Sequence, residues 1–132
     1  MTSSSSIATR KILIAEDEII SALSISESLN VWGYQVCGLA STGEEAVAIA
    51  ETLNPDLILM DIRMATANDG ITAAEAIRAR RLGVPIIFIT GYPEAESELR
   101  GKRLDPFDFM QKPVNFDQLK NKIESLLHNS NS

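Results

Sequence analysis

Polar side chains suited to binding a metal ion and a phosphoryl group follow four short apolar runs of this sequence. The runs and the residues after them are 11–15 with Glu16-Asp17, 57–60 with Asp61, 85–89 with Thr90, and 108–111 with Lys112. A carboxylate at the end of a buried strand is costly unless it is needed there. If the four strands are parallel, these side chains converge at one edge of one sheet, where such folds bind ligands.

The three acids are candidate ligands of a cation. Glu16, Asp17 and Asp61 would repel one another at one sheet edge unless a cation lay between them. Ligands that offer only oxygen favour a hard ion such as Mg²⁺. Alternatively, the acids after the first strand only cap the helix that follows, since acids suit a helix N-terminus. The placement of Asp61 at the matching end of another strand favours the metal.

Asp61 is also a candidate nucleophile, because a carboxylate can attack a phosphoryl donor when positive charge neutralises the incoming group. Lys112 could then pair with one phosphoryl oxygen as a compact cation, and Thr90 could donate its hydroxyl to another. Taken singly, Lys112 is an ordinary surface lysine and Thr90 an ordinary strand residue. Their joint placement raises them to site residues.

The alternation of short apolar and longer amphipathic runs predicts repeated βα units and a parallel sheet. Strands are expected at 11–16, 34–39, 57–61, 86–90 and 108–111. Helices are expected at 19–32, from Thr42 to Asn54-Pro55, at 71–82, at 93–104, and after a cap at Asn115 or Asp117. In the first helix, Ile20, Leu23, Ile25, Leu29 and Val31 are the apolar positions. Five strands and five helices in alternation predict a single doubly wound α/β sandwich.

The length of 132 residues suits one domain, expected at 10–129 between tails at 1–9 and 130–132. The net charge of −6 argues against nonspecific nucleic-acid binding. Arg78-Ala79-Arg80-Arg81, the compact basic cluster, is expected to be a solvated helix end. The apolar runs are too short for a membrane helix, the N-terminus does not resemble a signal peptide, and the single Cys37 suits a reducing setting. A cytoplasmic location is therefore expected.

Together, these residues resemble the site of the response-regulator receiver domains of two-component signalling. The pattern of that family is an acidic pair after the first strand, a phospho-accepting Asp after the third, Thr or Ser after the fourth, and Lys-Pro after the fifth. Here these positions hold Glu16-Asp17, Asp61, Thr90 and Lys112-Pro113. The resemblance implies the flavodoxin-like strand order 2-1-3-4-5, phosphorylation on Asp61, and signalling without an enzymatic activity.

The resemblance also implies roles for single residues. Mg²⁺ (or Mn²⁺) would be bound directly by Asp17 and Asp61, through water by Glu16, and by the backbone carbonyl of Arg63. The Lys112-Pro113 peptide bond is often cis in this family. On phosphorylation Thr90 would move toward the phosphoryl group and vacate space for Phe109, whose other reading is an ordinary core aromatic. The signal would then leave through the face made by the fourth helix, fifth strand and fifth helix.

Two departures from the commonest family pattern matter. The loop after Asp61 lacks the usual stiffening proline and reads Met64-Ala65-Thr66-Ala67-Asn68-Asp69-Gly70. Phe88-Ile89-Thr90-Gly91-Tyr92 is similar to the motif of an alphaproteobacterial receiver subgroup named for Phe-x-Thr-Gly-x-Tyr, although Gly-Tyr after a strand is also a plain turn. Arg63 and Tyr92 would flank the path of a hydrolytic water, so they either prolong the life of the phosphoryl group or are plain solvent-facing side chains.

The leading interpretation is a stand-alone receiver that takes phosphate from a histidine kinase or histidine phosphotransferase. It would act by contact with a protein target or relay the phosphate, with a phosphorylation-dependent homodimer as one possible arrangement. Neither nucleic acid nor membrane is an expected partner. A pseudo-receiver docking module without phosphotransfer is the main alternative. An aspartyl-phosphate phosphatase is disfavoured, because such enzymes need a second Asp where this chain has Arg63.

Overall fold

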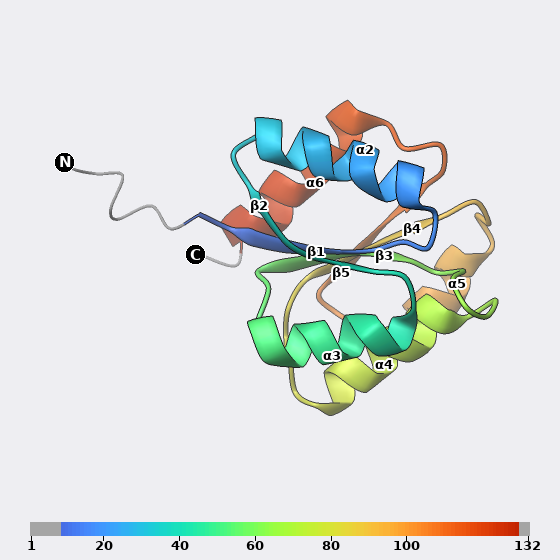
Figure 1. The fold of residues 1–132 in the computed structure, drawn as a ribbon. Coiled ribbons are helices and arrows are strands. Elements are labelled where there is room, and N and C mark those ends of the chain that lie inside the picture. Colours follow the sequence, from blue (N-terminus) through green and yellow to red (C-terminus); the bar gives the residue numbers. More distant parts are fainter. Residues whose placement is uncertain (1–8, 130–132) are drawn as a thin grey trace.

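The computed structural model describes residues 9–129, so the predicted tails at 1–9 and 130–132 lie outside it except for residue 9. Five parallel strands form one sheet in the order β2-β1-β3-β4-β5, which confirms the predicted fold class. The elements are β1 (Lys11–Ala15), α2 (Ile19–Val31), β2 (Gln35–Ala40), α3 (Gly43–Leu53), β3 (Leu57–Asp61), α4 (Asp69–Ala79), β4 (Ile86–Thr90), α5 (Ala95–Arg100), β5 (Phe107–Gln111) and α6 (Phe116–Asn129). Helices α2 and α6 cover one face of the sheet, and α3 and α4 cover the other (Figure 1). No helix within residues 9–129 is long and apolar enough to cross a membrane.

The register of the strands brings their carboxyl ends to one edge of the sheet. Ala15 pairs with Met60, Asp61 with Ile89, and Thr90 with Gln111. The residues that follow β1 and β5 therefore meet the last residues of β3 and β4. This strand register explains why the carboxylates, the Thr90 hydroxyl and the Lys112 ammonium converge.

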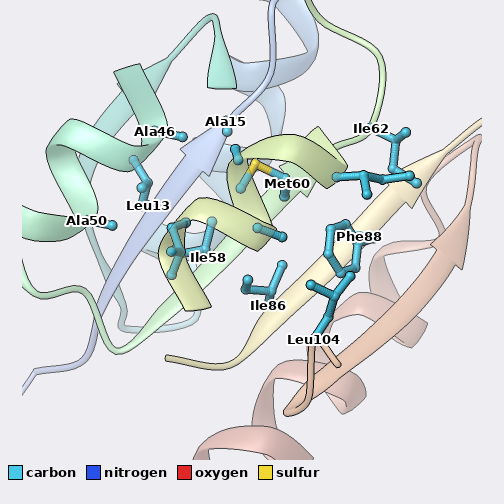
Figure 2. Packing of buried hydrophobic residues seen from close by; sticks show 14 of the residues in the cluster. Leu13, Ala15, Ala46, Ala50, Ile58, Met60, Ile62, Ile86, Phe88 and Leu104 are labelled. Carbon is cyan, nitrogen blue, oxygen red and sulfur yellow. The ribbon is translucent and has the colours of Figure 1, made fainter. Parts of the chain in front are cut away.

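Strands β3 and β4 are buried along their whole length, as central strands of a parallel sheet with both faces covered must be. Their side chains alternate between two hydrophobic clusters, one under α3, α4 and α5 and one under α2 and α6. Figure 2 shows the first cluster, in which Ile58, Met60 and Phe88 from the central strands pack with Ala46 and Ala50 of α3. Burying each large apolar side chain contributes about 1.5–3 kcal/mol, so the core holds the ends of β3 and β4 in place.

Caps fix the start of α3 and α6 as the sequence predicts. Thr42 Oγ1 accepts a hydrogen bond from the Glu45 backbone N–H at 3.1 Å, and the Glu45 carboxylate accepts one from Ser41 N–H at 2.8 Å. This arrangement is a variant of the capping box, because the Glu45 carboxylate reaches the N–H of Ser41, one residue before the Thr42 cap. Of the two candidate caps for α6, Asn115 is the one that accepts, from Gln118 N–H at 3.0 Å.

Two predicted helices have different bounds in the structure. The helix expected at 93–104 is only α5, six residues long, because the chain turns after Gly101 and Leu104 is buried in the core. Asp105 precedes a proline, which also disfavours helical backbone. The helix expected at 71–82 is α4, which begins at Asp69 and ends at Ala79, and Arg81 adopts φ +61° just after it.

The apolar face of α2 is narrower than expected. Ile25 and Leu29 are buried, together with the small Ala22, which lets the helix lie close to the sheet. Ile20, Leu23 and Val31 instead face solvent, with exposed fractions of 78%, 54% and 79%. Helical periodicity finds apolar positions but does not say which of two apolar faces packs on the sheet.

Arg78 is not a solvated helix end, which corrects the expectation for the basic cluster. Its guanidinium donates to three backbone carbonyls, those of Leu82 (2.7 Å), Leu104 (2.9 Å) and Pro106 (3.0 Å). The fork of donors on an arginine suits such clasping. Arg78 thereby ties the end of α4 to the segment that leads into β5.

The two ends of the described chain lie at the edge of the sheet opposite the carboxyl ends of the strands. Strand β1 starts there at Lys11, and α6, running antiparallel to the strands, finishes there at Asn129 (Figure 1).

Candidate functional site

An open hollow of about 410 Å³ lies at the carboxyl edge of the sheet, and we call it the acidic pocket. Its lining residues are Glu16, Asp17, Glu18, Asp61, Arg63, Thr90, Gly91, Tyr92 and Lys112. The structure thus brings together every predicted site side chain except those of Phe109 and Pro113. Glu16, Asp61 and Thr90 are buried, whereas Asp17 is exposed at the mouth.

Lys112 bridges the two buried carboxylates. Its Nζ lies 3.0 Å from Asp61 Oδ2 and 3.3 Å from Glu16 Oε1. Burial by itself lowers the pKa of Lys112, but hydrogen bonds and charge from Asp61 and Glu16 outweigh it and raise the pKa above its ordinary value. Lys112 therefore stays an ammonium directed at Asp61.

The acids of the pocket disfavour each other's charged forms. Burial raises the pKa of Glu16, and the nearby negative charge of Asp61 raises it further, against a lowering hydrogen bond from Glu18 N–H at 3.0 Å. The pKa of Asp17 is also raised, by partial burial and then by contact with Glu16. One lysine does not neutralise three carboxylates, so the pocket favours binding a further positive charge.

The carboxylates are placed to hold that charge. One oxygen from each of Glu16, Asp17 and Asp61 lies within 4.8 Å of the other two. An all-oxygen set with an open side toward solvent fits Mg²⁺, which keeps several waters and uses one or two carboxylates. The donor set therefore fits the ion that the sequence implies.

The raised pKa values predict how stability depends on pH and metal. Just above the ordinary pKa values of 4.5 for Glu16 and 3.8 for Asp17, these two groups bind more protons in the folded protein than in the unfolded chain. Their contribution to stability without divalent ions therefore falls as pH rises through that range. Glu16→Gln should therefore be more stable than wild type at neutral pH, and this advantage should vanish below about pH 4. Mg²⁺ at a hundred times its dissociation constant should add about 2.7 kcal/mol to wild type, and far less to Asp17→Asn.

Urea unfolding from about pH 3 to pH 8, with and without Mg²⁺, measures both effects. Glu27→Gln, which removes an exposed acid on α2, is the matched control and should follow wild type. A Glu16→Gln variant less stable than wild type at pH 7 would contradict the expectation.

Arg63 and Tyr92 contact each other across the rim of the acidic pocket. The Arg63 guanidinium carbon lies 4.1 Å from the centroid of the Tyr92 ring, and its Nη1 donates a hydrogen bond to the Tyr92 hydroxyl. The pair joins the loop after β3 to the loop after β4. Beneath it, the buried Thr90 accepts a hydrogen bond at Oγ1 from Tyr92 N–H at 3.1 Å.

Phe109 lies outside the acidic pocket. It pairs with Phe88 in the register of β4 and β5 and packs, half-buried, against the cluster under α3, α4 and α5. The Lys112–Pro113 peptide bond is cis, and so is Asp105–Pro106.

Gly70 and Asp69 are site residues that the sequence reasoning missed. A Cβ at Gly70 would lie 2.1 Å from the backbone oxygen of Asp61 and 2.8 Å from Ile62 Cα, so only glycine fits behind the candidate nucleophile. Asp69 accepts backbone hydrogen bonds from Ala65 and from Gly43 on α3. The Asp-Gly pair at the end of the loop was a signal, but we expected only an unstiffened loop there.

A parallel sheet with an acidic pair, a buried aspartate, a threonine and a lysine at its carboxyl edge defines a signalling receiver. Residues 12–124 match the response regulator receiver domain family, and the chain belongs to that family.

Known relatives and solved structures agree. The transcriptional regulatory protein PdtaR of Mycobacterium tuberculosis is 36% identical over 115 residues, which cover 87% of this chain and 55% of PdtaR. The chain thus spans about half the length of that relative. The receiver domain of a diguanylate cyclase from Desulfovibrio desulfuricans is 38% identical, with a TM-score of 0.80 over 92% of this chain and 96% of that one. The receiver domain of the response regulator PhyR from Erythrobacter litoralis is 31% identical, with a TM-score of 0.79 over 93% of each chain. Membership of the Phe-x-Thr-Gly-x-Tyr subgroup stays a prediction.

Proposed function

We propose that this domain accepts a phosphoryl group on the carboxylate of Asp61 and signals by contact with other proteins. The observation that carries the proposal is the buried Asp61 carboxylate, 3.0 Å from the Lys112 ammonium and grouped with Glu16 and Asp17. The donor would be a phosphohistidine on a histidine kinase or histidine phosphotransferase. PdtaR and the other regulatory relatives support a signalling role rather than an enzymatic one. The proposed place of action is the cytoplasm.

In the proposed transfer, an Asp61 oxygen forms a bond to phosphorus while the bond from phosphorus to the donor nitrogen breaks. The electron pair of that bond stays on the imidazole, which takes up a proton. Lys112 would pair with one phosphoryl oxygen and Thr90 would donate its hydroxyl to another. Asp17, Asp61, the Arg63 carbonyl and, through water, Glu16 would hold Mg²⁺, which neutralises charge on the incoming group.

The proposed output follows from the placement of Thr90 at the end of β4, paired with Gln111 of the neighbouring strand β5. If Thr90 turns toward the phosphoryl group, it leaves Tyr92 N–H and frees space that Phe109 can enter. The changed surface would be that of α5, β5 and α6, where a target protein or a second copy would bind. NMR of a ring-labelled Phe109 before and after phosphorylation would test this; an unchanged ring environment argues that Phe109 is only a core aromatic.

The central test is incubation with Mg²⁺ and acetyl phosphate, followed by intact mass. Wild type should gain the mass of one phosphoryl group and Asp61→Asn should gain none. Asp56→Asn is the control, because Asp56 lies beyond the opposite end of β3, where it accepts a hydrogen bond from Lys11 N–H. A wild type that takes no phosphoryl group would favour the docking module.

We propose that the donor protein docks on the exposed side of α2. A largely apolar hollow of about 660 Å³ adjoins the acidic pocket, sharing Glu16, Glu18 and Lys112 with it. Ile20 lines this hollow and is 78% exposed. A donor that reaches Asp61 can therefore bury Ile20 at the same time.

Ile20→Asp should slow transfer from a phosphohistidine protein about tenfold, through the loss of one buried apolar contact, while transfer from acetyl phosphate stays unchanged. Val31→Asp alters an equally exposed residue farther along α2, outside the hollow, and should transfer normally. Rates from both donors, measured by radiolabel or mass, decide the matter. Equal slowing by the two variants would contradict the proposal that the donor docks at Ile20.

The Arg63–Tyr92 pair is proposed to prolong the phosphorylated state by covering one approach to Asp61. Tyr92→Ala and Arg63→Asn should each shorten the half-life, by roughly the tenfold that about 1.4 kcal/mol represents. The measurement is loss of the phosphoryl mass over time at fixed Mg²⁺. Arg100→Asn, which only breaks a surface ion pair with Glu96, should leave the half-life unchanged. Unaltered half-lives in both site variants would show that the pair is simply solvent-facing.

A further inference from the structure

The side chain of Asp69 holds the loop between Asp61 and α4 in place. Asp69 Oδ2 accepts hydrogen bonds from Ala65 N–H at 3.0 Å and from Gly43 N–H at 2.9 Å. The first bond holds the middle of the loop, and the second ties it to the first residue of α3. One carboxylate oxygen therefore connects three elements next to the acidic pocket.

The surroundings are shaped to this carboxylate. A Cβ at Gly43 would lie 2.4 Å from Asp69 Oδ1 and 2.7 Å from the Asp69 backbone oxygen, so the close approach requires glycine at position 43. The loop is also closed at its ends, because Gly70 N–H donates to Ile62 O at 2.8 Å and Asp69 N–H donates to Thr66 O at 3.3 Å. This bonding replaces the stiffening that the missing proline would supply.

We propose that Asp69 is a positioning residue for the phosphorylation site. Arg63 lies two residues before Ala65, so the bond from Ala65 to Asp69 restrains both its carbonyl and its guanidinium relative to Asp61. Arg63 N–H already reaches Asp61 Oδ1 at 3.3 Å. Asp69 thereby sets the geometry of a proposed metal ligand and of the Arg63–Tyr92 pair without touching either. This role rests on the proposed function of Asp61.

Two substitutions separate hydrogen bonding from charge. Asp69→Asn removes the negative charge but keeps a carbonyl oxygen, which can accept both bonds because both go to one oxygen. Asp69→Ala removes the charge and the acceptor. Asp56→Ala is the control, since it deletes a carboxylate that accepts from Lys11 N–H at 2.7 Å at the far end of the sheet.

The readouts are amide hydrogen exchange without metal, and Mg²⁺ affinity. Asp69→Ala should speed exchange at residues 43 and 63–65 at least tenfold and weaken Mg²⁺ binding about tenfold, the usual loss when a group supporting a ligand is removed. Asp69→Asn should stay within about threefold of wild type in both. Asp56→Ala should leave both unchanged.

Equal losses in Asp69→Asn and Asp69→Ala would show that only charge matters and would overturn the positioning role. Unchanged exchange at residues 63–65 in Asp69→Ala would also overturn it, whatever the phosphorylation result. Failure of wild type to gain a phosphoryl group would instead defeat the proposed function, while the exchange data would still decide whether Asp69 holds the loop.

Discussion

Lys112→Ala should slow phosphorylation of Asp61 by acetyl phosphate about 10²–10³-fold, the usual cost of removing one group that stabilises developing charge. The ammonium lies 3.0 Å from Asp61 Oδ2, close enough to meet an oxygen of a phosphoryl group on that carboxylate. The same substitution should strengthen Mg²⁺ binding about fivefold, because roughly 1 kcal/mol of repulsion between two cations is relieved. Slower phosphorylation with tighter metal binding distinguishes loss of phosphoryl stabilisation from general damage to the pocket.

Lys122→Ala is the matched control for Lys112. Lys122 forms an ion pair with Asp108 at 3.1 Å, between α6 and β5 and outside the acidic pocket. It should leave both phosphorylation and Mg²⁺ affinity unchanged. Initial rates by intact mass and Mg²⁺ titrations by calorimetry provide the comparison. If Lys112→Ala weakened metal binding as much as it slowed phosphorylation, Lys112 would be a structural residue of the pocket.

Gly70→Ala should be the most destabilising single methyl that can be added near the site. Its Cβ would meet two backbone atoms, Asp61 O at 2.1 Å and Ile62 Cα at 2.8 Å, and neither can turn aside as a flexible side chain could. Overpacking of this kind costs about 1–3 kcal/mol or more, which exceeds the gain of up to ~1 kcal/mol from replacing glycine in a helix. The end of β3 must shift, so phosphorylation should fall as well.

Gly83→Ala adds the same methyl where nothing lies within 4 Å, and it should be close to neutral. Chemical denaturation of the two variants beside wild type measures the difference. A Gly70→Ala protein that unfolds at the wild-type midpoint would mean that α4 can move away from β3 at little cost.

The parts of this domain that could be predicted from sequence depend on local patterns. The apolar run before Asp61 is a strand buried on both faces, so its end is placed by the core. The polar residues at the ends of four parallel strands had to share an edge of the sheet. The cap formed by Ser41, Thr42 and Glu45 likewise lies within a few residues of chain. These features need no knowledge of distant contacts.

The parts that could not be predicted depend on contacts between distant segments. Asp69 and Gly43 are 26 residues apart, as are Arg78 and Leu104. The sequence around one residue of each pair does not indicate that it contacts the other residue. The early end of α5 follows from the burial of Leu104, which is a tertiary effect. Ala22 rather than Ile20 faces the sheet because close packing of α2 favours a small side chain there.

The position of the two chain ends has a consequence for how the domain can be joined to other proteins. Lys11 and Asn129 lie at the amino edge of the sheet, while Asp61 and the apolar hollow by Ile20 lie toward the carboxyl edge. A segment joined at either end of the described residues would therefore leave the carboxyl edge, with the proposed phosphoacceptor, open. Connections to other domains and the proposed chemistry can therefore lie at opposite edges of the sheet.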